Sequence, residues 1–205
     1  GSGITQEWFV RQFAQERQES LEAAYRRMDE ALTDVPAGCD GLMAIGMLGG
    51  TVMPFDGDIR GVFLGHTWSH GRAHFYRALM ESFGFALASA IDRIDDMYPE
   101  YANREGIRVI GGGVKSENCM QLFADTLGKP LETIGQDDAA LWGACILAAK
   151  SVGLIDSINQ FTHDHVTRSR VYQPNDNLRD LYQRLREQYQ NYEKKLSPLC
   201  GARIR

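Results

Sequence analysis

The chain lacks an excess of basic residues and lacks any apolar run long enough to cross a bilayer. Its 22 Lys and Arg residues stand against 27 Asp and Glu residues, which gives a formal charge of −5. This balance provides no electrostatic footprint for nucleic acid or for an anionic membrane surface. The longest apolar run, Trp142 to Ala149, is much shorter than the roughly 20 residues of a membrane-spanning helix. Residues 1–17 mix aromatic and charged side chains and do not resemble a signal peptide.

Closely spaced cysteine pairs are also missing from the sequence. Cys39, Cys119, Cys145 and Cys200 lie far apart and form no C-x-x-C pair. Scattered single thiols of this kind are typical of reduced residues that pack in a core, so the sequence predicts a cytoplasmic protein.

No catalytic or metal-binding motif stands out. The sequence has no G-x-S-x-G nucleophile turn. His66, His70 and His74 are spaced four apart, as metal ligands on one helix would be, but the glycines and serine around them oppose a continuous helix. His163 and His165 lack a third ligand. The sequence therefore predicts neither a metal site nor a catalytic residue.

The periodicity of apolar residues predicts alternating strands and helices in a chain long enough for one large or two small domains. The longest predicted helix covers 72–97, where small residues such as Gly84 would let a second element approach closely. Ser116 and Gly128 are suited to begin and end another helix. Further helices are predicted at 21–32, from Asp137 or Asp138 to about 152, and at 178–196, strands at 42–48, 61–65, 107–110 and 131–134, and irregular or weakly extended chain at 163–172. This order implies an α/β fold.

The most informative local feature is a triglycine, Gly111–Gly113, between a predicted strand and a predicted helix. Glycines let a ligand approach the backbone, and the N-terminus of the following helix favours a phosphate or the polar edge of a nucleotide. A P-loop would need glycine where Val109 and Val114 stand, and a dinucleotide fingerprint would need a third glycine at Ser116. A tight turn without any ligand is the alternative interpretation.

Four blocks of sequence together indicate a family. They are Gly111–Ser116 with Gln121, Ala124-Asp125 and Leu127–Pro130; Arg60–Gly65 with His74, Arg77-Ala78 and Glu81; Ala139–Ala144; and Gly41-Leu42 through Gly49-Gly50. These blocks resemble the C-terminal domain of the FGGY carbohydrate kinases, the family of xylulokinase, ribulokinase, gluconokinase and glycerol kinase. The first block is similar to the family's adenosine-binding loop and helix, the second to its R-A-x-x-E helix and the third to its A-x-G-A helix.

The resemblance implies a ribonuclease H-like/actin-like ATPase lobe of the α/β class, with a mixed sheet flanked by helices and a long C-terminal helix. It also implies that residues 1–205 form the C-terminal, adenine-nucleotide-binding lobe of a larger kinase. The N-terminal lobe and the catalytic base would then precede Gly1, so the isolated chain is expected to be inactive.

The resemblance further implies which residues contact ATP. Gly111, Gly112 and Gly113 would lie under the nucleotide and Ser116 near its ribose or α-phosphate, while Thr67 and Ser69 are further candidates in the loop before helix 72–97. Mg²⁺ would arrive with ATP and would need no dedicated cage in this domain.

The implied activity of the parent protein is ATP-dependent phosphorylation of a sugar or polyol, with a ketopentose such as xylulose favoured. Thr51 and Val52 replace the family's Glu-Arg pair and His66 replaces an aliphatic residue, so the exact sugar stays open. The other interpretations are a non-catalytic actin-like interaction or regulatory module and a fragment of a Rossmann-type dehydrogenase. Whether the protein forms a homodimer through its last helix also stays open.

Overall fold

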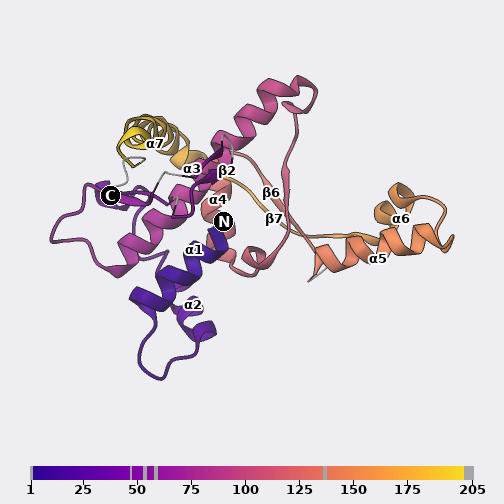
Figure 1. Cartoon of the computed structure of the whole chain (residues 1–205), viewed down its shortest axis with the longest axis horizontal. Helices are drawn as coiled ribbons and strands as arrows, with labels where there is room; N and C mark the ends of the chain where they lie inside the picture. The colour runs from indigo at the N-terminus through magenta and orange to yellow at the C-terminus, as the bar shows by residue number, and fades with distance from the viewer. Residues whose placement is uncertain (1, 47, 53–54, 58–59, 136–137, 201–205) are drawn as a thin grey trace.

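The computed structural model describes residues 2–46, 48–52, 55–57, 60–135 and 138–200, which form seven α-helices and three small sheets (Figure 1). The helices are α1 (Ser2–Phe9), which continues into a π-helix, η1 (Val10–Ala14), α2 (Leu21–Glu30), α3 (Arg72–Met97), α4 (Glu117–Leu127), α5 (Ala139–Ser151), α6 (Ile158–His165) and α7 (Arg179–Cys200). The strands are β1 (Met43–Ile45), β2 (Thr51–Val52), β3 (Phe55–Asp56), β4 (Val62–Leu64), β5 (Ile107–Val109), β6 (Leu131–Ile134) and β7 (Arg168–Tyr172). None of the helices in this part of the chain is long and apolar enough to span a membrane.

The largest sheet is mixed and has the strand order β5-β6-β7. β5 pairs with β6 in parallel, with Ile107 opposite Leu131, and α4 makes the crossover between them. β7 pairs with β6 antiparallel, with Tyr172 opposite Leu131. The mixed sheet and its covering helices agree with the α/β architecture that the sequence implies. β1 with β4, and β2 with β3, form two further antiparallel pairs.

Most predicted elements are confirmed, and one is wrong in part. α3 covers the predicted residues 72–97, and Asp138 caps α5 through the amide of Leu141, whereas the alternative cap, Asp137, lies outside the described residues. The stretch 163–172 is predicted to be irregular or weakly extended: its second half, β7, is extended as predicted, but its first residues belong to the end of α6. Its strand depends on pairing with β6, about forty residues earlier, and no local pattern of apolar residues announces it.

Helix α3 is the centre of the largest hydrophobic cluster. Tyr76, Leu79 and Met80 are each at most 2% exposed and pack with residues of α1, η1, α2 and α4. The other buried members of this cluster are Phe9, Val10, Ala14, Ala24, Met28, Leu32, Cys119 and Leu122. The N-terminal half of α3 therefore joins the first helices of the chain to the start of α4.

Gly84 allows α3 and α4 to pack at close range, as the small residues of this helix predict. A Cβ atom added at Gly84 would lie 2.9 Å from Cβ of Thr126, and closer still to the Thr126 hydroxyl oxygen. Thr126 is itself buried, and its Cβ is fixed to the backbone of α4. The two helices would have to separate to admit a methyl group.

We expect Gly84→Ala to lower the free energy of unfolding by about 2 kcal/mol. The steric cost of the added methyl group is larger than the stability gained from the higher helix propensity of alanine. Chemical denaturation of the purified chain measures this change. Gly143→Ala on α5 is the matched control, since a Cβ there meets nothing within 4 Å, and it should not destabilise. A Gly84→Ala variant as stable as the parent would show that the two helices do not depend on this close approach.

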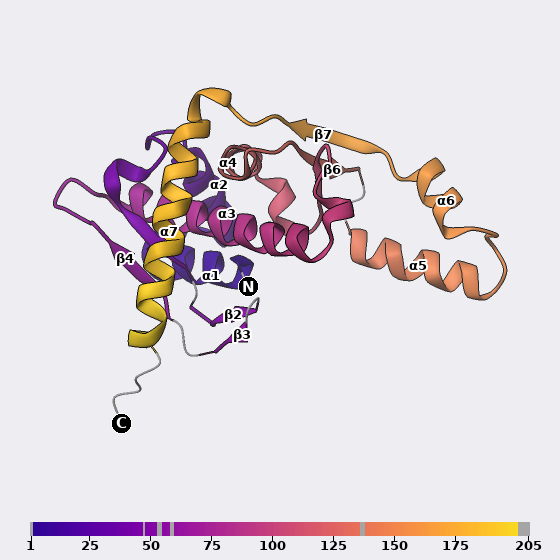
Figure 2. The ribbon, with the colours of Figure 1, turned by 90° about the horizontal axis from the view of Figure 1, so that it is seen from above.

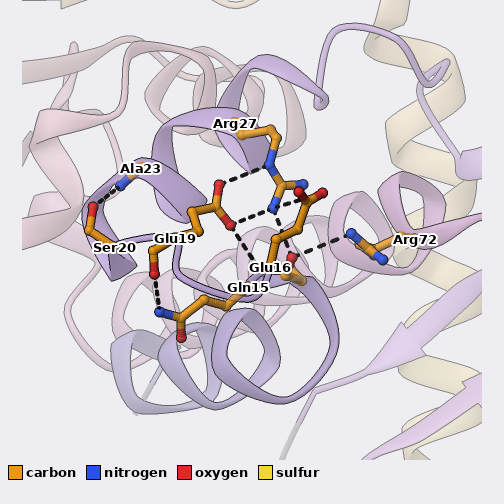
Figure 3. Close-up of polar contacts among 8 residues, drawn as sticks. Gln15, Glu16, Glu19, Ser20, Ala23, Arg27 and Arg72 are labelled. Carbon is orange, nitrogen blue, oxygen red and sulfur yellow. Dashed lines mark hydrogen bonds and ion pairs between the residues drawn. The ribbon is translucent and has the colours of Figure 1, made fainter.

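A polar clamp fixes α2 against η1 and α3 (Figure 3). Arg27 donates to both carboxylate oxygens of Glu19, at 3.0 and 2.8 Å, and to the carbonyl of Ala14 at 2.8 Å. The carbonyl of Ala14 also accepts from Arg72 at the start of α3, at 3.3 Å. The hydrogen bonds from Arg27 lower the pKa of Glu19, so the pair is ionised at neutral pH. The clamp sets the position of α2 relative to the two neighbouring helices.

A second, buried polar network joins α3 to α7, which crosses it in Figure 2. The Glu81 carboxylate, 3% exposed, accepts from Arg77 at 3.1 Å, from the Tyr182 hydroxyl at 3.0 Å and from the amide of Gly38 at 3.0 Å. Burial raises the pKa of the Cys39 thiol, which therefore stays protonated and donates to Glu81 at 3.6 Å. The R-A-x-x-E block of the sequence thus supplies a structural centre.

Helices α5 and α6 project from the rest of the molecule (Figure 2). They pack on each other, with the rings of Trp142 and Phe161 6.0 Å apart. The apolar side chains that α5 and the following turn expose most are Leu141, Leu147, Val152 and Leu154. A helix this apolar on all sides is typical of one that is buried in a larger assembly.

Candidate functional site

The triglycine forms a turn between β5 and α4, and we call residues Gly111–Ser116 the glycine loop. Gly111 has φ 104° and ψ −177°, a conformation that side chains rarely adopt. Residues Gly112–Lys115 then make a short 3₁₀ turn, η4, and Ser116 caps α4. The predicted strand, glycine turn and capped helix are all confirmed.

The space beside the glycine loop is open. Gly111, Gly112 and Gly113 are exposed, and a Cβ added at any of them would meet no atom within 4 Å. The backbone conformation explains the glycine at 111. It does not explain those at 112 and 113, which lie outside the left-handed region. Since glycine adds conformational entropy that folding must overcome, two unexplained glycines on an open surface favour a ligand that approaches the backbone closely.

Ser116 has a structural role that limits its chemistry. Its hydroxyl oxygen accepts from the amide of Cys119 at 3.0 Å, and its proton is donated to the carboxylate of Asp29 in α2. A hydroxyl has one proton and two lone pairs. The proton of Ser116 is therefore already used, so toward a ligand the hydroxyl can act only as an acceptor.

Thr67 and Ser69 lie in an exposed turn before α3. Their hydroxyls are 2.8 Å apart, and the amide of Thr67 donates to Nδ1 of His70 at 2.8 Å. His70 in turn lies 3.4 Å, through Nε2, from the carbonyl of Asp40. His70 links this turn to Asp40, whereas Ser116 links the glycine loop to Asp29. The structure brings together the four candidates of the glycine loop but gives Thr67 and Ser69 a separate set of partners.

The three histidines spaced four apart do not share a helix, because α3 begins only at Arg72. His74 accepts from the amide of Gly71 at 3.2 Å through Nδ1 and lies 3.3 Å, through Nε2, from the Asp40 carboxylate. Within the described ranges of the chain, no three His, Cys, Asp or Glu residues are grouped so that they could hold a metal ion.

Two residues of the site, Asp29 and Asn118, carry no signal in the sequence. The Asn118 side-chain amide donates to the carbonyl of Asp29 at 3.0 Å and to its carboxylate at 3.3 Å. These contacts join residues that are 89 positions apart in the chain. Only the packing of α2 beside the start of α4 creates them, so no local motif could have revealed them.

Comparison with known proteins decides the family. Residues 1–152 match the family model described as "FGGY family of carbohydrate kinases, C-terminal domain". The chain belongs to this family. The FGGY kinases share the actin-like ATPase fold, so the fold that the sequence implied is confirmed.

Xylulose kinases are prominent among the similar FGGY proteins. The chain is 27% identical to xylulose kinase of Bacillus subtilis over 93% of its own length and 36% of that protein. It is 31% identical to xylulose kinase of Staphylococcus epidermidis over 80% of its length and 33% of that protein. The chain thus spans about a third of the length of these curated relatives.

Solved structures of FGGY kinases match the backbone. The crystal structure of xylulose kinase from Rhodospirillum rubrum matches with a TM-score of 0.81 and 27% identity, over 97% of this chain and 38% of that one. Glycerol kinase of Plasmodium falciparum, solved with ADP, matches with a TM-score of 0.74 over 96% of this chain and 37% of that one. At 18% identity, the second likeness concerns the fold alone.

Proposed function

We propose that this domain binds the adenosine part of ATP at the glycine loop, as the nucleotide-binding lobe of an ATP-dependent carbohydrate kinase. The observation that carries the proposal is the open, exposed triglycine in the turn between β5 and α4, in a member of a carbohydrate kinase family. The N-terminus of α4 adds a partial positive charge that favours the polar groups of a nucleotide.

The proposed substrate class is a sugar or polyol, with a ketopentose such as xylulose as the first choice. Support comes from the two xylulose kinases to which the chain is 27% and 31% identical. Thr51 and Val52, in place of the Glu-Arg pair expected from the family pattern, are the sequence differences most relevant to the choice of sugar.

The proposed mechanism assigns this lobe the task of positioning. Phosphoryl transfer depends on holding nucleotide and acceptor in line and on neutralising charge. The backbone of Gly111–Gly113 would support the adenosine, and the hydroxyl oxygen of Ser116 would lie near its ribose. Mg²⁺ would be carried in by the phosphates of ATP. The proton acceptor for the sugar hydroxyl is proposed to belong to a separate, N-terminal lobe, and the whole enzyme to act in the cytoplasm.

We expect the purified 205-residue chain to bind ATP weakly and to phosphorylate no sugar, because one lobe cannot clamp both substrates. Calorimetric titration with ATP and with NAD measures binding, and ADP formation with D-xylulose and Mg²⁺ measures turnover. Xylulose kinase of Bacillus subtilis serves as the positive control for turnover. Sugar-dependent ADP formation by the 205 residues alone would contradict the division of labour between lobes, and tighter binding of NAD than of ATP would contradict the nucleotide assignment.

A further inference from the structure

Asp29 in α2 accepts three hydrogen bonds from the end of the glycine loop and the first turn of α4. Its carboxylate accepts from the Ser116 hydroxyl and from the Asn118 side-chain amide, the latter at 3.3 Å, and its carbonyl accepts from the same amide at 3.0 Å. These contacts reach the last residue of the loop and the first turn of α4. One residue of a distant helix therefore holds the point where the loop ends.

The position of Asp29 within α2 is unfavourable for the helix itself. Asp29 is the penultimate residue of α2, where the negative end of the helix dipole disfavours a carboxylate. The hydrogen bonds to Ser116 and Asn118 provide a reason for an acid at this place.

The helix that carries Asp29 is itself a fixed support. Met28, next to Asp29, is 1% exposed in the largest core cluster. Two residues before Asp29, Arg27 binds Glu19, as Figure 3 shows, and donates to the carbonyl of Ala14. A support held by both core packing and a polar clamp can transmit a defined position to the loop.

The glycine loop needs such an anchor because its own residues restrict it little. Three successive glycines have more conformational freedom than any other residues, and a ligand that orders them loses affinity to the entropy of ordering. Fixing the end of the loop before the ligand arrives reduces this loss.

We propose that Asp29 is a positioning residue for the nucleotide site: through Ser116 and Asn118 it holds the glycine loop in the conformation that receives adenosine. This inference rests on the proposed function of the loop. It adds a residue that touches no part of the nucleotide and acts through its contacts with the loop.

The test compares Asp29→Ala and Asp29→Asn in the 205-residue chain, with Glu30→Ala, a neighbour on α2, as the matched control. Three quantities are measured: affinity for ATP by calorimetry, hydrogen exchange of the amides of Gly112–Ser116 without nucleotide, and thermal unfolding. Loss of a charge-assisted hydrogen bond predicts about tenfold weaker ATP binding for Asp29→Ala. Asp29→Asn keeps a carbonyl acceptor for Ser116 and should weaken binding only about threefold.

Positioning and mere stabilisation predict different results. Positioning predicts faster amide exchange in the loop and weaker ATP binding in Asp29→Ala, at a temperature where every variant is folded, with Glu30→Ala unchanged. A variant that unfolds earlier but binds ATP and protects the loop like the parent would overturn the inference. If the parent chain itself binds no ATP, the proposed function fails first, whereas normal binding by both the parent and Asp29→Ala overturns only the role of Asp29.

Discussion

Replacing Gly112 with valine is expected to weaken ATP binding by more than about a hundredfold while leaving the fold intact. A Cβ at this position meets no protein atom within 4 Å, and the backbone there is not in the left-handed region, so the protein itself tolerates the side chain. The side chain would, however, block adenosine, because its methyl groups occupy the space in which the ligand packs against the backbone. Calorimetric titration with ATP, together with thermal unfolding, separates the two effects.

The same substitution on α5 is the control for this prediction. A Cβ added at Gly143 also meets no atom within 4 Å, so Gly143→Val should leave ATP affinity unchanged and the fold intact. Equal ATP affinity in the parent and in Gly112→Val would place the nucleotide elsewhere. The triglycine would then be a turn without a ligand.

Glu81→Ala is expected to lower the free energy of unfolding by about 3–5 kcal/mol, the largest stability change predicted for a single side chain. Removing the carboxylate leaves the guanidinium of Arg77 without its buried partner and also removes the acceptor of Gly38 and Tyr182. The change should loosen α7 from α3, since Tyr182 links the two helices. Chemical denaturation measures the loss, and proteolysis in the segment before α7 reports whether the helix detaches.

Two further variants show how much of the stability lost in Glu81→Ala comes from the hydrogen bonds of Tyr182. Tyr182→Phe removes two hydrogen bonds of the network, the one donated to Glu81 and the one accepted from Arg77, and should lower the free energy of unfolding by about 1–3 kcal/mol. Glu30→Ala, at the end of α2 and away from this network, should change it by less than about 0.5 kcal/mol. If Glu81→Ala lowered the free energy of unfolding no more than Glu30→Ala does, water would have to replace the carboxylate as the hydrogen-bond partner of Arg77, and the predicted role of Glu81 would be wrong.

Local signals predict the elements whose cause is local. Ser116 caps α4 through the amide of Cys119, and Gly128 ends the same helix with φ 62°, both as expected from residue type. α3 follows its apolar spacing over all 26 residues. β7 cannot be predicted as a strand from local sequence in this way, because it forms by pairing with β6, which is far away in the sequence. Ser157, which caps α6, is a local signal for the helix that ends within 163–172.

The residues of the candidate site also fall into those that local sequence predicts and those that only the structure reveals. The glycine loop could be found from three adjacent glycines before a capped helix. Asp29 could not, because its contacts join α2 to α4 across positions 87 and 89 residues apart. The candidates Thr67 and Ser69 came from the family resemblance alone, and the structure shows them bonded to each other and, for Thr67, to His70. A contact of either residue with nucleotide stays a prediction.

The most direct test of the nucleotide site is an amide NMR titration of the isotopically labelled chain with ATP and Mg²⁺. We expect saturable shifts that are largest at the amides of Gly111, Gly112 and Gly113 and that extend into the first turn of α4. Unchanged signals from these three glycines at ATP concentrations that saturate the chain, or shifts confined to Thr67–Ser69, would contradict the assignment of the glycine loop as the adenosine site.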